Sequence, residues 1–233
     1  MKIHRFYVED SDLTKNIWIH QRDLIHQWIN VLRFKVGQDL VLFDGVENEK
    51  LYKIAEIKKD EVNLEFVTDF HRNLPKKDIY LFWSLLKKDK NSWILQKCTE
   101  LGVTHFIPIL AGRSEKTGLK TDRYRKIIIE AVEQCGRSDI PKLREPLSLE
   151  NAINQYQSKI YLYFAEQSDD QEVVDNASLE QQDSVGIFVG PEGGWTEAEL
   201  SLFENQKVKE LNLHDFTLRA ETASLVSVSK LLQ

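Results

Sequence analysis

The chain has 233 residues, of which 42% are hydrophobic and 29% are charged, and its formal net charge is −6 at pH 7. This length accommodates one large domain or two modest ones, and the composition is that of an ordinary globular protein that folds without added crosslinks. The acidic balance argues against a protein that coats nucleic acid indiscriminately.

Cysteine and histidine usage limits the chemistry further. Cys98 and Cys135 are the two cysteines, and neither they nor the six histidines show the spacing of a zinc site. We therefore expect no disulfide framework, no metal and a reducing, cytoplasmic setting. The N-terminal residues are polar, and no apolar run approaches the roughly 18 residues that span a bilayer. We expect neither export nor membrane insertion.

The first part of the chain predicts a helix followed by short strands. A helical stretch covers residues 20–33, and alternating apolar runs at 39–43, 51–57 and 61–67 follow it. The dipeptide Asp44-Gly45 is a turn signal between two of these runs. Strands this short at this spacing indicate a small β-barrel. The texture of the sequence changes near residues 71–75, so we expect one domain over 1–72 and a second over 73–233.

The rest of the chain alternates apolar, strand-like runs with helical stretches. The expected strands are residues 79–85, 105–110, 160–164 and 185–189, and the expected helices are 92–101, 122–134 and 196–204. This alternation is typical of an α/β fold, a mainly parallel sheet covered by helices. Thr196 and Glu199 have the spacing of a capping box, so a helix should begin directly after the glycine-rich segment that precedes them.

That glycine-rich segment reads G-P-E-G-G-W at residues 190–195 and follows the last buried strand. Open α/β sheets bind ligands at the carboxyl ends of their strands. Gly193 and Gly194 can adopt positive φ and present N–H groups to carboxylate or adenine acceptors. A sharp strand-to-helix turn without a ligand is the alternative. The chain lacks G-x-G-x-x-G and G-x-x-x-x-G-K-[ST], so dinucleotide and nucleoside triphosphate sites lose their main support.

A charged cluster, L-R-A-E-T-A at residues 218–223, precedes an apolar helix of small residues expected over 224–232. A helix N-terminus with Glu221 in its first turn explains part of this cluster. It does not explain Arg219, whose five-donor guanidinium suits a phosphate or a uracil carbonyl.

Several further motifs occur in order along the chain. They are V-L-R at 31–33, F-D-G at 43–45, Q-K-C-T-E-L-G-V at 96–103, R-S at 113–114 and E-Q-C-G-R at 133–137. With these motifs the sequence resembles, nearly from end to end, the ribosomal RNA small subunit methyltransferase E family of the SPOUT superfamily. The resemblance implies a C-terminal SPOUT-type α/β domain with a deep trefoil knot at the cofactor site, and an N-terminal PUA-like β-barrel that helps to hold RNA. It also implies a homodimer in which the partner subunit completes the cofactor site.

The implied activity is transfer of a methyl group from S-adenosylmethionine to N3 of a uridine in the decoding region of 16S ribosomal RNA. By resemblance, the cofactor site comprises Phe164, Ala165, Glu166, Gly190, Glu192, Gly193, Gly194, Leu213, Leu218 and Arg219. Glu221 is the first candidate for removal of the N3 proton, Glu192 is the alternative, and Arg219 would stabilise negative charge on a uracil oxygen. Where the family reads L-G-P-R-[IV]-L-R, residues 213–219 read L-H-D-F-T-L-R, and we interpret His214 as a substituted turn residue.

Two basic stretches leave room for an RNA contact. Residues 76–97 hold six Lys or Arg against two Asp or Glu, and residues 112–145 hold nine against six. The candidates for phosphate contacts are Arg5, Arg33, Lys97, Arg113 and Arg137. For each of them a surface charge or an ion pair within the protein is the alternative.

Two rival hypotheses stay open on the sequence alone. A catalytically silent RNA-binding protein with the same fold is consistent with the altered turn at 213–216, and titration with the cofactor would distinguish it. A flavodoxin-like nucleotide-binding domain with an accessory barrel is consistent with the alternating elements, but it does not account for L-R-A-E-T-A.

Overall fold

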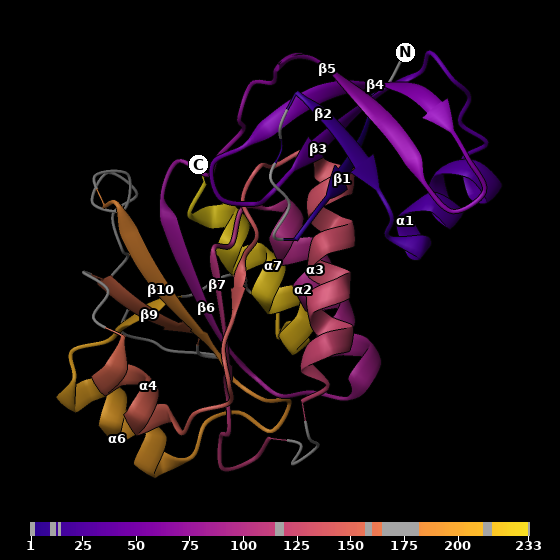
Figure 1. Ribbon diagram of the computed structural model, residues 1–233. Coiled ribbons are helices and arrows are strands. Elements are labelled where there is room, and N and C mark those ends of the chain that lie inside the picture. The colour runs from indigo at the N-terminus through magenta and orange to yellow at the C-terminus, as the bar shows by residue number, and fades with distance from the viewer. Residues whose placement is uncertain are drawn as a thin grey trace. The chain divides into compact units, whose positions relative to one another are not determined.

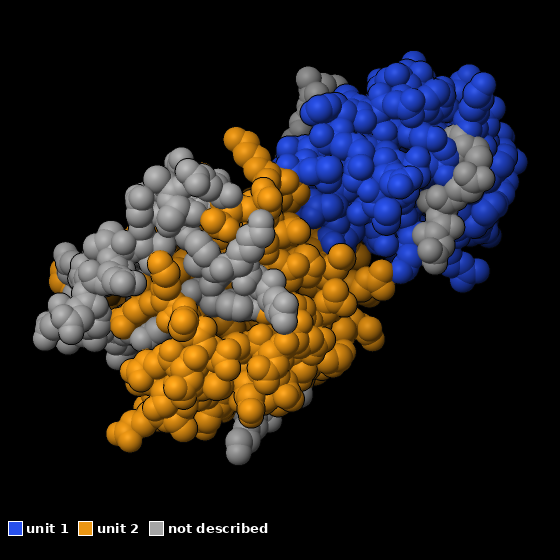
Figure 2. Space-filling view, turned by 90° about the vertical axis from the view of Figure 1, so that its left-hand side faces the viewer, with its two compact units in different colours: residues 1–74, 132–140 blue, residues 75–131, 141–233 orange. Residues whose placement is uncertain are grey.

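The computed structural model describes residues 3–9, 13, 15–114, 119–156, 160–164, 182–211 and 216–232. The chain divides into two compact units, residues 1–74 with 132–140 and residues 75–131 with 141–233 (Figure 2). Each unit contains its own β-sheet.

The first unit is built on a five-stranded mixed sheet with the order β1-β3-β4-β5-β2. Its strands are β1 (His4–Tyr7), β2 (Asn16–Ile19), β3 (Asp39–Phe43), β4 (Glu49–Ile57) and β5 (Val62–Asp69). β1 pairs with β3 in parallel, and the other neighbours pair antiparallel. The three expected strands are confirmed as β3, β4 and β5, whereas the short strands β1 and β2 were not predicted from the sequence.

The turn between β3 and β4 forms where the Asp44-Gly45 signal predicted it. Asp44 Oδ1 accepts the backbone N–H groups of Val46 and Asn48 at 2.8 and 3.0 Å, and Gly45 has a φ of +75°. An aspartate that bonds its own following backbone, next to a glycine in the left-handed region, is a stable way to reverse the chain.

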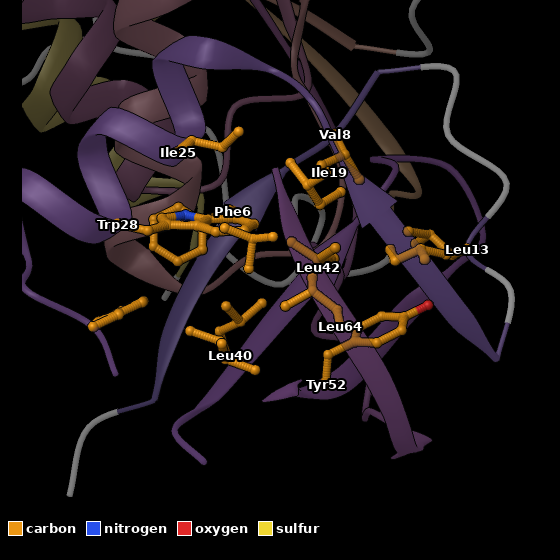
Figure 3. Close-up of a cluster of buried hydrophobic side chains, with 14 residues drawn as sticks. Phe6, Val8, Leu13, Ile19, Ile25, Trp28, Leu40, Leu42, Tyr52 and Leu64 are labelled. Carbon is orange, nitrogen blue, oxygen red and sulfur yellow. The ribbon is translucent and has the colours of Figure 1, made fainter. Parts of the chain in front are cut away.

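A hydrophobic core packs between this sheet and the helical segment at residues 22–31 (Figure 3). The expected helix at 20–33 is present in two parts, α1 (Arg22–His26) and the π-helical turn η1 (Gln27–Val31). Ile25 and Trp28 point from these two parts toward Phe6 and the strand residues, and Trp28 is fully buried (Figure 3). Helix and sheet therefore share one core.

The second unit contains a six-stranded sheet with the order β11-β9-β10-β6-β7-β8, and every pair in it is parallel. The strands are β6 (Asp78–Ser84), β7 (His105–Ile109), β8 (Lys142–Leu143), β9 (Ile160–Phe164), β10 (Ser184–Val189) and β11 (Lys209–Leu211). The expected parallel α/β architecture is confirmed. The knot expected from the resemblance stays a prediction.

Helices cover both faces of this sheet (Figure 1). They include α2 (Lys88–Glu100) and α7 (Ala220–Lys230) on one face, α4 (Leu149–Gln155) and α6 (Glu197–Asn205) on the other, and α3 (Thr121–Cys135). Phe82, Ile107 and Phe188 pack with residues of α4 and α6. On the other face, Trp83 Nε1 donates to Asn91 Oδ1 of α2 at 3.1 Å. Successive side chains of β6 thus enter different cores, as the alternation of a strand requires.

The helices begin partly where the sequence predicted and partly earlier. The capping box is confirmed, because the Thr196 side chain accepts from the Glu199 backbone N–H and the Glu199 side chain accepts from that of Thr196. α2 begins four residues before the expected helix. α7 (Ala220–Lys230) also begins four residues before the expected start at 224, so that L-R-A-E-T-A covers its N-cap and first turn. Within the described ranges, no helix is both long and apolar enough to cross a membrane.

Candidate active site

A cavity of about 910 Å³ lies at the carboxyl end of β10. Its lining combines the glycine-rich loop and the start of α7 with Lys90 of α2, Arg113 from the segment after β7, and Leu200 of α6. The lining residues are Lys90, Arg113, Val189, Gly190, Pro191, Glu192, Gly193, Gly194, Trp195, Leu200, Thr217, Leu218, Arg219 and Ala220. Six residues expected at the cofactor site are among them: Gly190, Glu192, Gly193, Gly194, Leu218 and Arg219.

The strand register explains why these loops meet. β6 and β10 are neighbours at the centre of the sheet, and Val189 pairs with Trp83, so both strands end at the same level. The chain leaves β6 toward α2 and leaves β10 into the glycine-rich loop. The sequence order also reverses between these two strands, which in open α/β sheets marks the place where ligands bind.

The glycine-rich loop is shaped by close packing at Gly190 and by a turn at Gly194. A Cβ atom on Gly190 would lie 3.0 Å from Trp195 Cε2, so the indole ring needs a glycine there. Gly194 has a φ of +68°, and its N–H donates to the Pro191 carbonyl at 2.9 Å. The expectation that this N–H is free for a ligand is therefore wrong for Gly194. Gly193 does not adopt a positive φ.

Arg113 supports the loop from the segment after β7. Its Nη1 atom donates to the carbonyl oxygen of Gly193 at 2.7 Å and to that of Trp195 at 3.3 Å. These bonds satisfy backbone acceptors of the loop and hold its path against the cavity. The guanidinium expected to contact RNA phosphate thus makes contacts within the protein.

Lys90 lies between the two carboxylates that were candidate bases. Its Nζ forms an ion pair with Glu192 of the loop and lies 3.5 Å from Oε2 of Glu221 in α7. The Lys90 side chain is 26% exposed, that of Glu192 56% and that of Glu221 17%. Lys90 joins the loop after β10 to the start of α7, and no motif of the sequence pointed to it.

The electrostatics follow from this arrangement. The carboxylate of Glu192 raises the pKa of Lys90, and Glu221 adds to the effect. The Lys90 side chain is therefore positively charged at neutral pH. In return, the Lys90 ammonium lowers the pKa of Glu192, and Arg219 contributes to the same shift. Oε2 of Glu221 is buried and makes no hydrogen bond with the described residues. This oxygen faces the Lys90 ammonium at 3.5 Å and keeps its capacity to accept a hydrogen bond.

Arg219 is the N-cap residue of α7, and it lines the cavity with an exposed side chain. Glu221 lies in the first turn of the same helix, as the sequence predicted. The start of α7 therefore presents a cation and a carboxylate two residues apart beside the glycine-rich loop.

The residues that line the cavity fit a cofactor such as S-adenosylmethionine, which has a charged amino-acid end and an adenine ring. Gly190, Gly193 and Gly194 let the backbone approach a ligand without side chains in between. In the part of the chain that the structure describes, no group of His, Cys, Asp or Glu is arranged to hold a metal ion.

Comparison with known proteins identifies the family of this chain. The RNA methyltransferase domain family matches residues 72–232, and the RNA methyltransferase PUA domain family matches residues 29–67. A ribosomal RNA small subunit methyltransferase E from Bacillus subtilis is 33% identical over 219 residues, covering 88% of this chain and 85% of that protein. The chain belongs to the ribosomal RNA small subunit methyltransferase E family.

Further relatives and solved structures support the membership in this family. The Rickettsia conorii protein of the same name is 29% identical and covers 99% of this chain and 95% of its own length. The Neisseria gonorrhoeae member of the family, solved with bound S-adenosylmethionine, has a TM-score of 0.86 at 26% identity, covering 98% and 96% of the two chains. A Legionella pneumophila protein solved with the same cofactor has a TM-score of 0.88 at 26% identity, covering 99% and 97%.

Other residues that the family resemblance placed at the cofactor site lie at or beyond the described ends. Phe164 is the last residue of β9, which pairs with β10. Its backbone therefore reaches the same edge of the sheet as Val189. Ala165, Glu166 and Leu213 lie outside the described residues, as does His214.

The two arginines Arg5 and Arg137, expected as RNA contacts of a family member, take part in ion pairs of the first unit. Arg5 pairs with Glu49, whose side chain is fully buried, and Arg5 Nη2 donates to the Arg137 carbonyl at 3.0 Å. Arg137 pairs with Asp139 at 2.7 Å and is itself buried. This placement favours a structural role for both arginines over phosphate contact.

Arg33 and Lys97 remain predicted RNA contacts. Arg33 is exposed after η1 with a φ of +56°, which is uncommon for a residue with a long side chain. Lys97 forms an ion pair with Glu100 at 2.8 Å on α2.

Proposed function

We propose that this chain is an S-adenosylmethionine-dependent methyltransferase that methylates N3 of a uridine in the decoding region of 16S ribosomal RNA. The observation that carries the proposal is the cavity at the carboxyl end of β10, which the glycine-rich loop with Glu192 lines together with Lys90 and Arg219. Glu221 does not line this cavity, but its carboxylate lies 3.5 Å from Lys90 Nζ. Membership in the family supports the same activity.

Methylation at N3 requires removal of a proton and stabilisation of charge. Uridine N3 carries a proton at neutral pH, and its loss leaves negative charge on the ring that spreads to the carbonyl oxygens. Glu221 accepts the proton, and Arg219 donates to a carbonyl oxygen on which charge develops. Bound S-adenosylmethionine supplies the electrophilic methyl group. The glycine-rich loop, held by Arg113, orients the reactants for in-line attack.

We assign RNA holding to residues 1–72, with Arg33 as a phosphate contact, and methyl transfer to residues 73–233. The active form in this proposal is a cytoplasmic homodimer. Trp93 on α2 is 40% exposed, and α2 packs against α7, so this helix offers an apolar side chain to a partner subunit.

The test is transfer of a labelled methyl group by the purified protein. The protein is incubated with S-adenosylmethionine carrying an isotopic methyl label and with small subunits, naked 16S RNA or 23S RNA. We expect label in the 16S substrates only, and tight cofactor binding by calorimetry. No binding at millimolar cofactor, or activity lost with a chelator and restored by zinc or magnesium, would contradict the proposal.

A further inference from the structure

Lys90 forms ion pairs with two carboxylates, those of Glu192 and Glu221. It pairs with Glu192 and lies 3.5 Å from Glu221 Oε2, and it also lines the cavity. Its pair with Glu192 joins residues 102 positions apart in the chain. Such a long-range contact fixes the ammonium at one place between the two central strand ends.

The hydrogen-bonding capacity of Lys90 exceeds what the two carboxylates use. A lysine ammonium has three N–H donors and no acceptor. Glu192 accepts one of these donors, and the ion pair with Glu221 at 3.5 Å orients the ammonium without a hydrogen bond, so donor capacity remains for a ligand oxygen in the cavity. A cation held in place before the reaction stabilises developing charge without the cost of reorganisation.

The proposed chemistry calls for two donors. When uridine N3 loses its proton, the negative charge is shared by the two carbonyl oxygens that flank N3, and Arg219 donates to one of them. Arg219 and Lys90 both line the cavity, so both cations face a ligand bound in it.

Resting on the proposed function, we propose that Lys90 is a catalytic residue that donates to the second carbonyl oxygen of the uracil ring. In this scheme the N3 proton moves to Glu221, the bond from sulfur to the methyl carbon breaks and leaves its electron pair on sulfur, and the new bond forms between N3 and that carbon. Glu192 acts as a positioning residue that holds Lys90, and it is not the base.

The test compares Lys90→Met with wild type on two RNA substrates in single-turnover methylation with saturating cofactor. One RNA contains uridine and the other contains 5-fluorouridine, whose N3–H is more acidic because fluorine withdraws electrons. We expect Lys90→Met to lower turnover on uridine RNA by about 10²-fold, while RNA and cofactor affinities change by no more than about threefold. On 5-fluorouridine RNA the defect should shrink several-fold, because the more acidic ring needs less help.

Matched variants sharpen this experiment. Lys90→Arg retains a cation and should recover part of the turnover. Lys58→Met removes a lysine that is likewise paired with one glutamate, Glu61, in the other unit, and should leave saturated turnover unchanged. The comparison of two substrates on one variant also cancels any loss of folded protein.

Two results would overturn the role of Lys90. The first is a turnover of Lys90→Met on uridine RNA that lies within about threefold of wild type. An equal defect on both RNAs is the other, because it would show that Lys90 supports structure and not the charge on the ring. Wild-type protein that methylates neither RNA would overturn the proposed function itself, and Lys90's role with it.

Discussion

Arg113 Nη1 lies 2.7 Å from the carbonyl oxygen of Gly193, so a side chain after β7 holds the loop after β10. Both loops emerge at the carboxyl edge of the same parallel sheet, where β7 and β10 flank β6. Arg113, which was a candidate for RNA phosphate contact, thus supports the wall of the cavity.

Arg113→Ala should weaken binding of S-adenosylmethionine by about tenfold, because a hydrogen bond from a charged donor contributes about 1.5 kcal/mol. Calorimetry measures this directly. Arg22→Ala, an exposed arginine of α1, is the matched control and should bind the cofactor as wild type does. Unchanged cofactor affinity together with weaker RNA binding would make Arg113 a phosphate contact after all.

Two glycines of one loop should respond differently to an added methyl group. Gly190→Ala places Cβ 3.0 Å from Trp195, and overpacking of this kind costs about 1 to 3 kcal/mol of unfolding free energy. Gly193→Ala meets only the Arg113 side chain at 3.4 Å and should keep the wild-type melting temperature. Differential scanning calorimetry of the two variants tests the packing, and equal melting temperatures would argue against it.

Arg5 should matter for stability and Arg33 should not. Arg5→Met leaves the fully buried Glu49 carboxylate without its cation, which costs about 3 kcal/mol. Arg33→Met removes an exposed charge and should change the unfolding free energy by less than about 0.5 kcal/mol. Urea unfolding measures both. If Arg5→Met is as stable as wild type but binds RNA less tightly, the phosphate role expected from the sequence is the correct one.

Arg219 should contribute to the methyl-transfer step, and Arg33 should contribute to RNA binding. Arg219→Ala should lower turnover by about 10²-fold with a smaller loss of RNA affinity, because its contact strengthens in the transition state. Arg33→Ala should raise the Michaelis constant for RNA and flatten its salt dependence, since a phosphate contact is equal in ground and transition states. Single-turnover methylation at several salt concentrations separates the two. Wild-type turnover of Arg219→Ala at saturation would make Arg219 a docking contact.

The active protein should be a homodimer. Two exposed apolar side chains, Trp93 on α2 and Leu232 just after α7, offer surface that association would cover. Analytical ultracentrifugation at micromolar concentration gives the mass. A monomer that retains full methyl transfer would refute this prediction.

The strands of the parallel sheet could be predicted because strands buried on both faces read as continuous apolar runs. β6, β7, β9 and β10 were found in this way, each to within one residue at either end. β1 and β2 were missed because four residues that alternate between burial and exposure carry little periodicity. The start of α2 was missed because its first turn, with Lys88 and Lys90, is polar.

The parts of the candidate site that are contiguous in the sequence could be predicted. The parts that depend on how neighbouring strands align could not. The glycine-rich loop and Arg219 are contiguous motifs, and they line the cavity as expected. The pairing of Lys90 with Glu192 follows from the alignment of β6 and β10, which the sequence of either strand does not state. Arg5 and Arg137 show the same limit, since a positive charge in the sequence does not reveal that its partner, such as Glu49, is buried.

The most direct test of the account is mass spectrometry of nucleosides and fragments of 16S ribosomal RNA from cells that lack this gene. The account predicts that one uridine of the decoding region loses a methyl group at N3, that the wild-type gene restores it, and that the Arg219→Ala gene restores it poorly. Ribosomal RNA with an unchanged set of methylated nucleosides, or a methyl group lost from another base or another position of the ring, would contradict the account.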